Sequence, residues 1–404
     1  MRTRFTARGG AVQIVYNEEQ EALRRELREY FSNLMTEEVQ QRMSSGDGEY
    51  GGGSAYRDLV RQMGKDGWLG IGWPTEYGGQ NRSMMEQLIF TDEASRAGAP
   101  VPFLTINTVG PTIMEYGTDE QRRFFLPKIL TGEMHFAIGY SEPDAGTDLA
   151  RLRTRAVRDG DEYIINGQKM WTSLIEHADY VWLAARTDPD APRHKGLSVF
   201  LVPTDSAGFK WTPVPTVTGA TTSQTFYEDV RVPTTALVGD ENSGWRLITG
   251  QLNRERVALC SAAGVQTSLE DVRRWAQQTK LPDGRRVIDQ EWVRLNLARV
   301  HAKVEFLKLI NWKIAWGVDK GVSPADASAT KVFGTEFYTE AYRLLMDCMG
   351  DDAYITQGSP GAVVRGRIER AYRGALILTF GGGTNEIQRD IISMVALGMP
   401  RAPR

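Results

Sequence analysis

The sequence predicts an α+β protein in which a small antiparallel β domain lies between two helical domains. Helical periodicity dominates residues 1–134, short strands alternate with turn signals over residues 135–245, and long helical segments return over residues 246–404. A chain of 404 residues is too long for one hydrophobic core. We therefore expect an N-terminal all-α domain, a middle β-barrel domain and a C-terminal helical bundle with these boundaries.

The N-terminal domain is expected to begin with an amphipathic helix. Asn17 and Gln20 have the spacing of a capping box, and EEQEALRRELREYFSNLM follows with helical periodicity. The glycine-rich stretch SSGDGEYGGGS at 44–54 predicts a loop or a disordered insert. Further helices are predicted in AYRDLVRQMGKDGW, SMMEQLIFTDEASRAG and TDEQRRFFLPKIL.

The middle and C-terminal domains carry different local signals. TRAVRDGDEYIING places an Asp159–Gly160 turn between two β-rich runs, and YVWLAART, GLSVFLVPT and SQTFYEDVRVP continue the strand pattern. In the C-terminal part, Ser323 is expected to cap a long helix, with Pro324 in its first turn and Asp326 near its positive end.

Composition excludes several classes of function. The net charge of −3, with basic residues spread along the chain, gives no reason to expect a nucleic acid or an anionic membrane as partner. With only two cysteines, disulfides are not expected and the cytoplasm is the simplest compartment. The four histidines have no metal-ligand spacing, so no metal site is expected.

Several motifs occur in a defined order along the chain. They are GWLGIGWPTEYGG (67–79), YSEPDAGTD (140–148), NGQKMWTS (166–173), VRVPTTALVGDENSGW (230–245) and the C-terminal GGGTNEIQRDII. Together they closely resemble the acyl-CoA dehydrogenase family over nearly the whole chain. The chain looks closest to actinobacterial members that act on CoA thioesters of steroid side chains.

This resemblance implies the acyl-CoA dehydrogenase-like fold, with a C-terminal four-helix bundle, and FAD as the cofactor. The implied reaction forms trans-2-enoyl-CoA: a base removes the α-proton while a β-hydride moves to flavin N5. An electron-transfer flavoprotein would accept the electrons. The implied substrates are acyl-CoA thioesters, and the finer assignment points to steroid side chains in cholesterol catabolism.

The resemblance assigns cofactor contacts to the two central motifs. Tyr140 and Ser141 would face the pyrimidine edge of the flavin, Trp171 would lie beside the ring, and the Ser173 hydroxyl would hydrogen-bond N5 or O4. Thr147 would donate to the flavin or to the CoA thioester. Without the motif, Trp171 would be read as a core aromatic of the barrel and Thr147 as a turn residue.

The resemblance implies that the catalytic base does not lie in the glycine-rich C-terminal loop. Many family members carry a glutamate immediately before Gly-Thr, whereas this chain has Gly382 there. Other members carry the base on the first long helix of the C-terminal domain, within a stretch that resembles LNRERVAL. Glu255 is therefore the candidate base and Arg256 a candidate CoA contact. Taken alone, the pair would be read as helix-surface charges or as members of structural ion pairs.

The loop retains other implied roles. The N–H of Gly382 would still polarise the thioester carbonyl, and the missing side chain would leave room for a larger acyl group. Gly383, Thr384 and Glu386 are assigned to cofactor binding. Thr384 is also expected to cap the following helix, whose N-terminus suits a phosphate.

The residues that family members lend to a neighbouring subunit's flavin are altered. TKLPDGRRVIDQEW (279–292) has no Arg-x-x-Phe-Gly pattern, and Glu291 replaces an expected glutamine. DCMGDD (347–352) has Asp347 and Asp351 where Gln and Gly are expected. We therefore expect the chain to pair with a related, different subunit in an α2β2 assembly that has half the usual flavins.

Two further interpretations remain open. Because Gly382 carries no acid, the chain could be a non-catalytic scaffold whose partner performs the chemistry. Because Glu255 and the flavin motifs are present, a catalytic subunit is the first hypothesis. A third interpretation keeps the fold but changes the chemistry to that of an acyl-CoA oxidase or a flavin monooxygenase.

Overall fold

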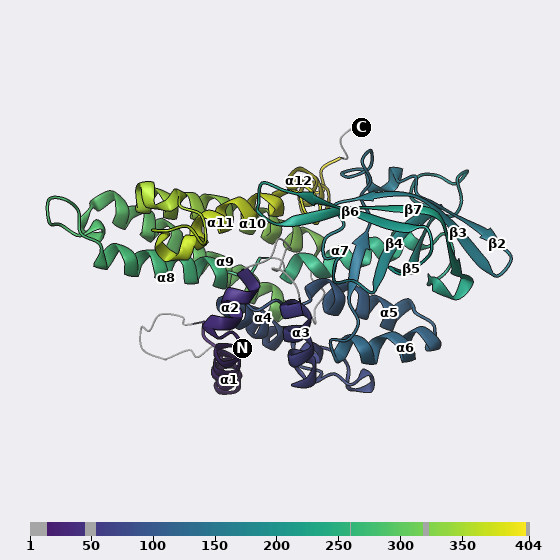
Figure 1. The fold of residues 1–404 in the computed structure, drawn as a ribbon, viewed down its shortest axis with the longest axis horizontal. Coiled ribbons are helices and arrows are strands. Elements are labelled where there is room, and N and C mark those ends of the chain that lie inside the picture. The colour runs from purple at the N-terminus through teal and green to yellow at the C-terminus, as the bar shows by residue number, and fades with distance from the viewer. Residues whose placement is uncertain (1–13, 45–53, 259, 318–322, 401–404) are drawn as a thin grey trace.

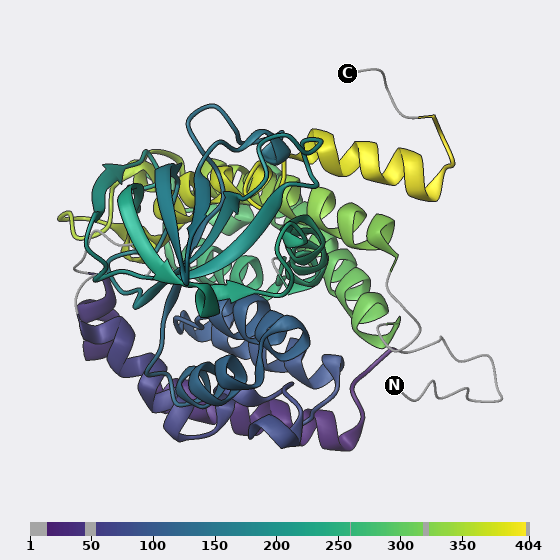
Figure 2. The same ribbon diagram turned by 90° about the vertical axis from the view of Figure 1, so that its right-hand side faces the viewer.

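The computed structural model describes residues 14–44, 54–258, 260–317 and 323–400, without the side chains of residue 44 and residues 252–258. Helices of the N-terminal part lie on one side of a β-sheet, and the long C-terminal helices extend away from it (Figure 1). Figure 2 shows the sheet above the N-terminal helices, with the C-terminal helices beside both. The predicted α+β class is confirmed.

Helices make up the N-terminal part. Asn17 caps the first helix as predicted, since its side chain accepts from the N–H of Gln20 (2.8 Å) and the Gln20 side chain accepts from the N–H of Asn17 (3.1 Å). Of the glycine-rich stretch, residues 45–53 lie outside the described residues. The helices are α1 (Glu18–Leu34), α2 (Glu37–Ser44), α3 (Ser54–Lys65), α4 (Met84–Ala97), the π-helix η3 (Thr105–Val109), α5 (Gly110–Tyr116) and α6 (Asp119–Leu130).

The middle part is an eight-stranded sheet with the order β6-β7-β3-β2-β4-β5-β8, in which β1 pairs with β4. The pairings are mainly antiparallel as predicted, but β1 and β2 each pair with β4 in parallel. Gly160, at φ +63°, lies in the predicted turn between β2 and β3. The strands are β1 (Phe136–Gly139), β2 (Arg155–Asp159), β3 (Glu162–Met170), β4 (Tyr180–Arg186), β5 (Leu197–Pro203), β6 (Phe209–Pro215), β7 (Thr221–Pro233) and β8 (Leu237–Val238).

The C-terminal part is helical, as predicted. Ser323 caps α10 by accepting from the N–H of Ala325 (3.2 Å), and Pro324 is the first helical residue. The helices are α7 (Gly244–Ala258), α8 (Ala263–Gln278), α9 (Glu291–Gly317), α10 (Pro324–Met349), α11 (Arg367–Ala375) and α12 (Asn385–Ile391). α10 contacts each of the others, so it forms the centre of this part.

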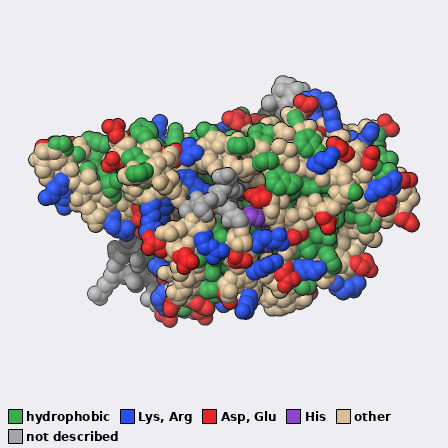
Figure 3. Space-filling view, viewed as in Figure 1, with side chains coloured by type: hydrophobic (Ala, Val, Ile, Leu, Met, Phe, Trp, Pro, Cys, Tyr) green, Lys and Arg blue, Asp and Glu red, His purple; other side chains and the backbone are tan. Residues whose placement is uncertain are grey.

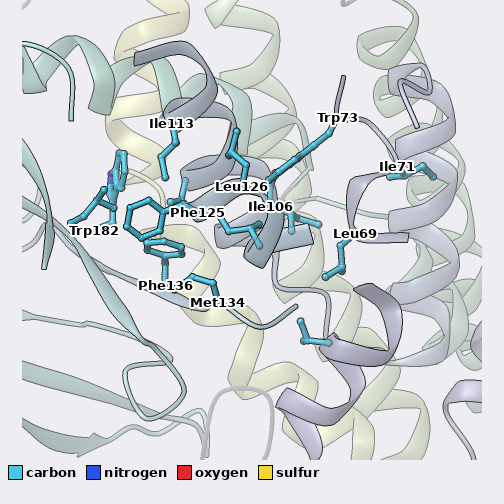
Figure 4. Close-up of a cluster of buried hydrophobic side chains, with 14 of the residues drawn as sticks. Leu69, Ile71, Trp73, Ile106, Ile113, Phe125, Leu126, Met134, Phe136 and Trp182 are labelled. Carbon is cyan, nitrogen blue, oxygen red and sulfur yellow. The ribbon is translucent and has the colours of Figure 1, made fainter. Parts of the chain in front are cut away.

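One hydrophobic core joins the N-terminal helices to the sheet. Phe125 of α6 packs against Phe136 of β1, and Trp182 of β4 belongs to the same buried cluster (Figure 4). A separate core lies between α8, α9 and α10. The shared core fixes β1, and therefore the loop that follows it, relative to the N-terminal helices. Among the described helices, none is long and apolar enough to cross a membrane.

Candidate active site

A buried ion pair fixes the loop that follows β1. Lys169 of β3 has no exposed surface, and its Nζ donates to Glu142 Oε1 (2.9 Å) and to the carbonyl oxygen of Tyr140 (3.0 Å). Glu142 also accepts from the backbone N–H of Arg153 (2.6 Å) and of Thr154 (2.8 Å). Burial lowers the pKa of Lys169 to about 8. Burial alone would raise the pKa of Glu142, but Lys169 and the N–H donors hold it below its usual value.

The same loop brings Ser141 beside the end of β3. The carbonyl oxygen of Ser141 accepts from the N–H of Met170 (2.9 Å), directly before Trp171. Trp171 has a left-handed backbone (φ +67°) and is 57% exposed. A bulky residue rarely adopts this conformation, and strained backbone is frequent at ligand sites. The indole is therefore an exposed apolar surface and does not belong to the core. It lies where β3 ends, and we call this end of the strands the sheet edge.

Ser173 lies at the same edge. The N–H of Thr172 donates to the carbonyl oxygen of Ser223 (2.9 Å), which attaches this segment to β7. The Ser173 hydroxyl lies 3.3 Å from the Thr222 hydroxyl and is partly exposed. The structure thus brings Ser141, Trp171 and Ser173 together, as the motifs predict.

The side chain of Tyr140 has a different environment from the one expected. It is buried, its hydroxyl donates to Gln251 Oε1 of α7, and it accepts from Trp182 Nε1 (3.0 Å). Gln251 Nε2 donates in turn to the hydroxyl of Thr112 on α5 (3.2 Å). Protein groups therefore engage both the hydroxyl and the carbonyl of Tyr140, and its role in cofactor binding stays a prediction.

A buried lysine organises the glycine-rich loop between α11 and α12. Lys331 of α10 has no exposed surface, and its Nζ donates to the carbonyl oxygens of Gly383 (2.7 Å) and Thr379 (3.2 Å). It also donates to Asn385 Oδ1 (2.7 Å). Carbonyl groups of the loop thus point towards α10.

The N–H of Gly382 is among the backbone donors of this loop that form no hydrogen bond between described residues. Gly382 and Gly383 have φ of +68° and +99°, a conformation that side chains disfavour. The N–H of Gly381 donates to Ile377, whereas no hydrogen bond between described residues uses the N–H of Gly382. Thr384 caps α12 as predicted, accepting from the N–H of Ile387 (3.3 Å), and Glu386 is exposed in the first turn.

Arg373 connects the two halves of the candidate site. Its Nη1 donates to the carbonyl oxygen of Val217 (2.7 Å), in the loop between β6 and β7. The same arginine pairs with Glu369 of α11 (2.6 Å). Since β7 carries the partner of Thr172, the helix before the glycine loop is attached to the sheet edge that displays Trp171. α12 lies near β6 (Figure 1).

The structure gives less information on three other predicted residues. Glu255 and Arg256 lie in the helical backbone of α7, but their side chains are outside the described residues. Thr147 is exposed in the loop between β1 and β2. Their catalytic and binding roles stay predictions.

The motifs did not identify the buried polar residues that hold the candidate site in place. Glu142 and Lys169 lie inside two motifs, and their opposite charges were a usable signal. Lys331 and Gln251 have no local signal, because only the folded chain buries them. The π-helix η3 is also invisible in the periodicity, although such segments are frequent at functional sites.

The donor set fits a flavin. Trp171 offers a flat apolar surface, Ser141 and Ser173 offer polar groups at the same edge, and Gly382 offers an N–H. A Cβ at Gly383 would lie 2.7 Å from Gln388 Nε2, so a side chain there would have to displace that amide. An aromatic wall with a few hydrogen-bonding groups is what an isoalloxazine ring requires.

Two surface hollows lie away from these residues. One of about 260 Å³ separates α1 and α4 from α8 and α9, and Asp92 borders it. The other, of about 560 Å³, lies between α2, α4, α8 and α11 and is bordered by four arginines, in a region where basic side chains are visible in Figure 3. Ion pairs engage three of these arginines: Arg96, Arg365 and Arg367. Among the described residues, no group of three or more His, Cys, Asp or Glu could hold a metal ion.

Comparison with protein families gives matches over most of the chain. The acyl-CoA dehydrogenase N-terminal domain matches residues 17–133, the middle domain of that family matches residues 137–230, and its C-terminal domain matches residues 242–397.

Individual relatives are similar over their whole length. The acyl-CoA dehydrogenase FadE26 of Mycobacterium tuberculosis is 65% identical over 97% of this chain and 100% of its own. FadE29 of the same organism is 46% identical over 96% and 98%. Among solved structures, the ChsE4–ChsE5 complex from Mycobacterium tuberculosis superposes with a TM-score of 0.91 at 65% identity, covering 96% of this chain and 100% of that chain. The Tcur3481–Tcur3483 steroid ACAD gives 0.90 at 49% identity, covering 96% and 99%.

Proposed function

This chain belongs to the acyl-CoA dehydrogenase family, and we propose that it is the catalytic subunit of a heteromeric enzyme that oxidises acyl-CoA thioesters to trans-2-enoyl-CoA. The resemblance inferred from the motifs is confirmed. One arrangement supports the proposed reaction. Trp171 and Ser173 lie at one end of the sheet, and Arg373 attaches the helix before the glycine loop to the neighbouring loop before β7. In that glycine loop, the N–H of Gly382 has no acceptor among the described residues.

Each residue has a separate task in this proposal. The carboxylate of Glu255 takes the α-proton, and the N–H of Gly382 stabilises the negative charge that develops on the thioester oxygen. Trp171 and Ser173 hold and orient FAD, which when bound accepts the β-hydride. A free glutamate has a pKa of about 4.3, so exclusion of water by a bulky acyl group would make Glu255 a stronger base.

We propose steroid side-chain CoA thioesters as the substrate class. A relative with 49% identity is described as a steroid acyl-CoA dehydrogenase, and Gly382 leaves space where other members carry a glutamate. An electron-transfer flavoprotein would be the acceptor, as in the family.

The proposed partner is a related but different subunit. The altered residues cluster at one end of the C-terminal helices: Cys348 Sγ lies 3.9 Å from the carbonyl oxygen of Val293, so Glu291 and Asp347 are near one another in the fold. Both carboxylates are exposed, as is Asp351. Such an end repels a pyrophosphate, so this subunit would not complete a neighbouring copy's flavin site.

An apolar face is available for that partner. α9 exposes large apolar side chains at helical spacing, which are Trp292, Leu295, Phe306, Leu309 and Trp316. Contiguous exposed apolar residues commonly mark protein interfaces. A related structure is a complex of two different subunits, ChsE4 and ChsE5, which supports the heteromeric proposal.

Co-purification with a related acyl-CoA dehydrogenase subunit from the same organism tests the function. We expect the complex to bind flavin and to oxidise steroid side-chain acyl-CoA, and Glu255→Gln to abolish turnover while flavin is retained. Unchanged turnover in that variant would support the scaffold hypothesis. Rapid reaction of the reduced complex with oxygen would support an oxidase or a monooxygenase. Stoichiometric flavin in the chain purified alone would contradict the heteromeric assembly.

A further inference from the structure

The helical segment 252–258, which carries Glu255, lies between two sets of buried polar contacts. On its N-terminal side is Gln251, the residue one helical turn before Glu255. On its C-terminal side, α7 ends at Ala258 and α8 begins at Ala263, so the helix is interrupted. We call residues 260–262 the helix break.

Gln251 attaches α7 to two other parts of the molecule. Its side chain is buried and accepts from the hydroxyl of Tyr140, in the loop fixed by the Glu142–Lys169 pair. It also donates to Thr112 Oγ1 (3.2 Å), and Thr112 donates to the carbonyl oxygen of Thr108 in the π-helix (2.7 Å). Residues four apart lie on one helix face. Gln251, one turn before position 255, therefore joins α7 to the loop after β1 and to α5.

Side chains from three helices hold the helix break. The Ser261 hydroxyl donates to Asp92 Oδ1 of α4 (2.5 Å) and accepts from the N–H of Ala263 (3.1 Å). Asn311 Nδ2 of α9 donates to the carbonyl oxygen of Cys260 (2.8 Å). The hydroxyl of Tyr338 on α10 donates to the carbonyl oxygen of Ser261. These contacts satisfy backbone groups that an interrupted helix leaves unpaired.

Stability alone explains these contacts poorly. Asn311 is buried, and its Oδ1 has no hydrogen-bond partner among the described residues. An unpaired buried acceptor costs about 1–3 kcal/mol, whereas an unbroken helix would need no such side chain. The interruption and its polar supports begin five residues after the candidate base.

We propose that Gln251, Asp92 and Asn311 are positioning residues for the proposed base. They fix the two sides of segment 252–258, and so set the direction in which Glu255 meets the α-carbon of the substrate. This inference rests on the proposed function, because it requires Glu255 to be the base. Asp92 acts through the Ser261 hydroxyl and Asn311 through the Cys260 carbonyl.

The test measures exchange of the substrate α-proton with deuterium by the reconstituted complex, in the absence of an electron acceptor. Exchange requires removal of the α-proton by the base but not reoxidation of the flavin, whereas turnover requires both. We expect Gln251→Leu and Asn311→Leu to slow exchange about 10- to 100-fold with flavin content and substrate KM retained, because small misplacements of a reacting group have effects of this size. Asn311→Asp, which keeps an acceptor but loses the amide donor, should behave like Asn311→Leu.

Gln121→Leu is the matched control. Gln121 is also a buried glutamine, and it bridges α6 to the carbonyl oxygens of Thr235 and Leu237 (2.8 Å each), away from α7. It should lower thermal stability without slowing exchange. If Gln251→Leu does not fold, Tyr140→Phe removes the same contact with little change in volume.

The outcomes separate the two proposals. If Glu255→Gln leaves exchange unchanged, the proposed base is wrong and the proposed function fails. If Glu255→Gln stops exchange while the Gln251 and Asn311 variants behave like Gln121→Leu, the positioning inference is overturned and the base assignment stands.

Discussion

The ammonium group of Lys331 lies 2.7 Å from the carbonyl oxygen of Gly383, so a fully buried charge on α10 holds the glycine loop. It also donates to two further acceptors, on Thr379 and Asn385. The N–H of Gly382 has no acceptor among the described residues, so it is available for the ligand role proposed for it. A lysine that sequence patterns do not mark thus shapes the loop at the proposed active site.

Lys331→Met should destabilise the protein and release flavin. The substitution removes a donor shared by three acceptors that are at least partly shielded from water, which we expect to cost about 1–3 kcal/mol of unfolding free energy. Chemical denaturation and the flavin-to-protein ratio of the complex measure the two effects. Lys313→Met is the control, since that side chain is 71% exposed and pairs with Asp326 on the surface. Equal stability of the two variants would contradict this role.

Glu142→Gln should destabilise the protein strongly at neutral pH, by about 3–5 kcal/mol, because it leaves the buried Lys169 without its counter-charge. The pKa of Glu142 is lower in the folded protein than its ordinary value of 4.5. Its stabilising contribution is therefore complete above pH 4.5 and is lost as the pH falls through the folded pKa. The difference in unfolding free energy between wild type and variant should shrink below pH 4.5. Glu228→Gln, which alters an exposed pair with Lys210, should show no such difference.

Asp92→Asn should change the pH dependence of stability in the opposite sense. Burial raises the pKa of Asp92 from 3.8 to about 6, so the folded protein retains a proton that the unfolded chain has released. Stability of the wild type should therefore fall as the pH rises from about 4 to 6 because of this group. The Asn variant should lack that slope while its amide oxygen still accepts from Ser261. Parallel stability curves in this pH range would show that Asp92 does not titrate as described.

The sequence predicted the fold well where the signals are local. Capping by Asn17, Ser323 and Thr384 and the turn at Gly160 depend on neighbouring residues, and all four are present in the structure. Parallel pairing of β1 and β2 with β4 was not predicted, because it depends on partners distant in the chain.

The sequence predicted the motif residues of the candidate site but not the residues that support them, because the supporting contacts join parts that are distant in the chain. Trp171 and Ser173 lie in a contiguous motif, and the structure displays both at one edge. Lys331 and Gln251 act because folding removes them from water and brings distant acceptors to them. No periodicity or spacing records such contacts. Tyr140 is the instructive case, since its motif position suggested flavin whereas its hydroxyl bonds to Gln251.

Trp171→Ala should reduce flavin binding by about tenfold or more without destabilising the fold, because an exposed aromatic contributes its surface mainly to a ligand. Fluorescence titration of the apo-complex with FAD measures the affinity, and a thermal melt measures the fold. Trp211→Ala on β6 is a suitable control, since Trp211 is 43% exposed but lies outside the motif. A similar loss of affinity in both variants would show that Trp171 has no special role.

Neutralising the acidic end of the C-terminal helices should increase flavin binding by the chain on its own. Glu291, Asp347 and Asp351 are exposed carboxylates at positions where the family resemblance places Gln, Gln and Gly. If their charge is what prevents the chain from completing a neighbouring copy's site, the triple variant Glu291→Gln, Asp347→Gln, Asp351→Gly should raise the flavin-to-protein ratio and favour a homodimer. Absorbance and size-exclusion chromatography measure both changes. Glu305→Gln removes another exposed carboxylate of α9 and should change neither. No increase in the triple variant would mean that missing donors in residues 279–292, rather than repulsion, make the partner necessary.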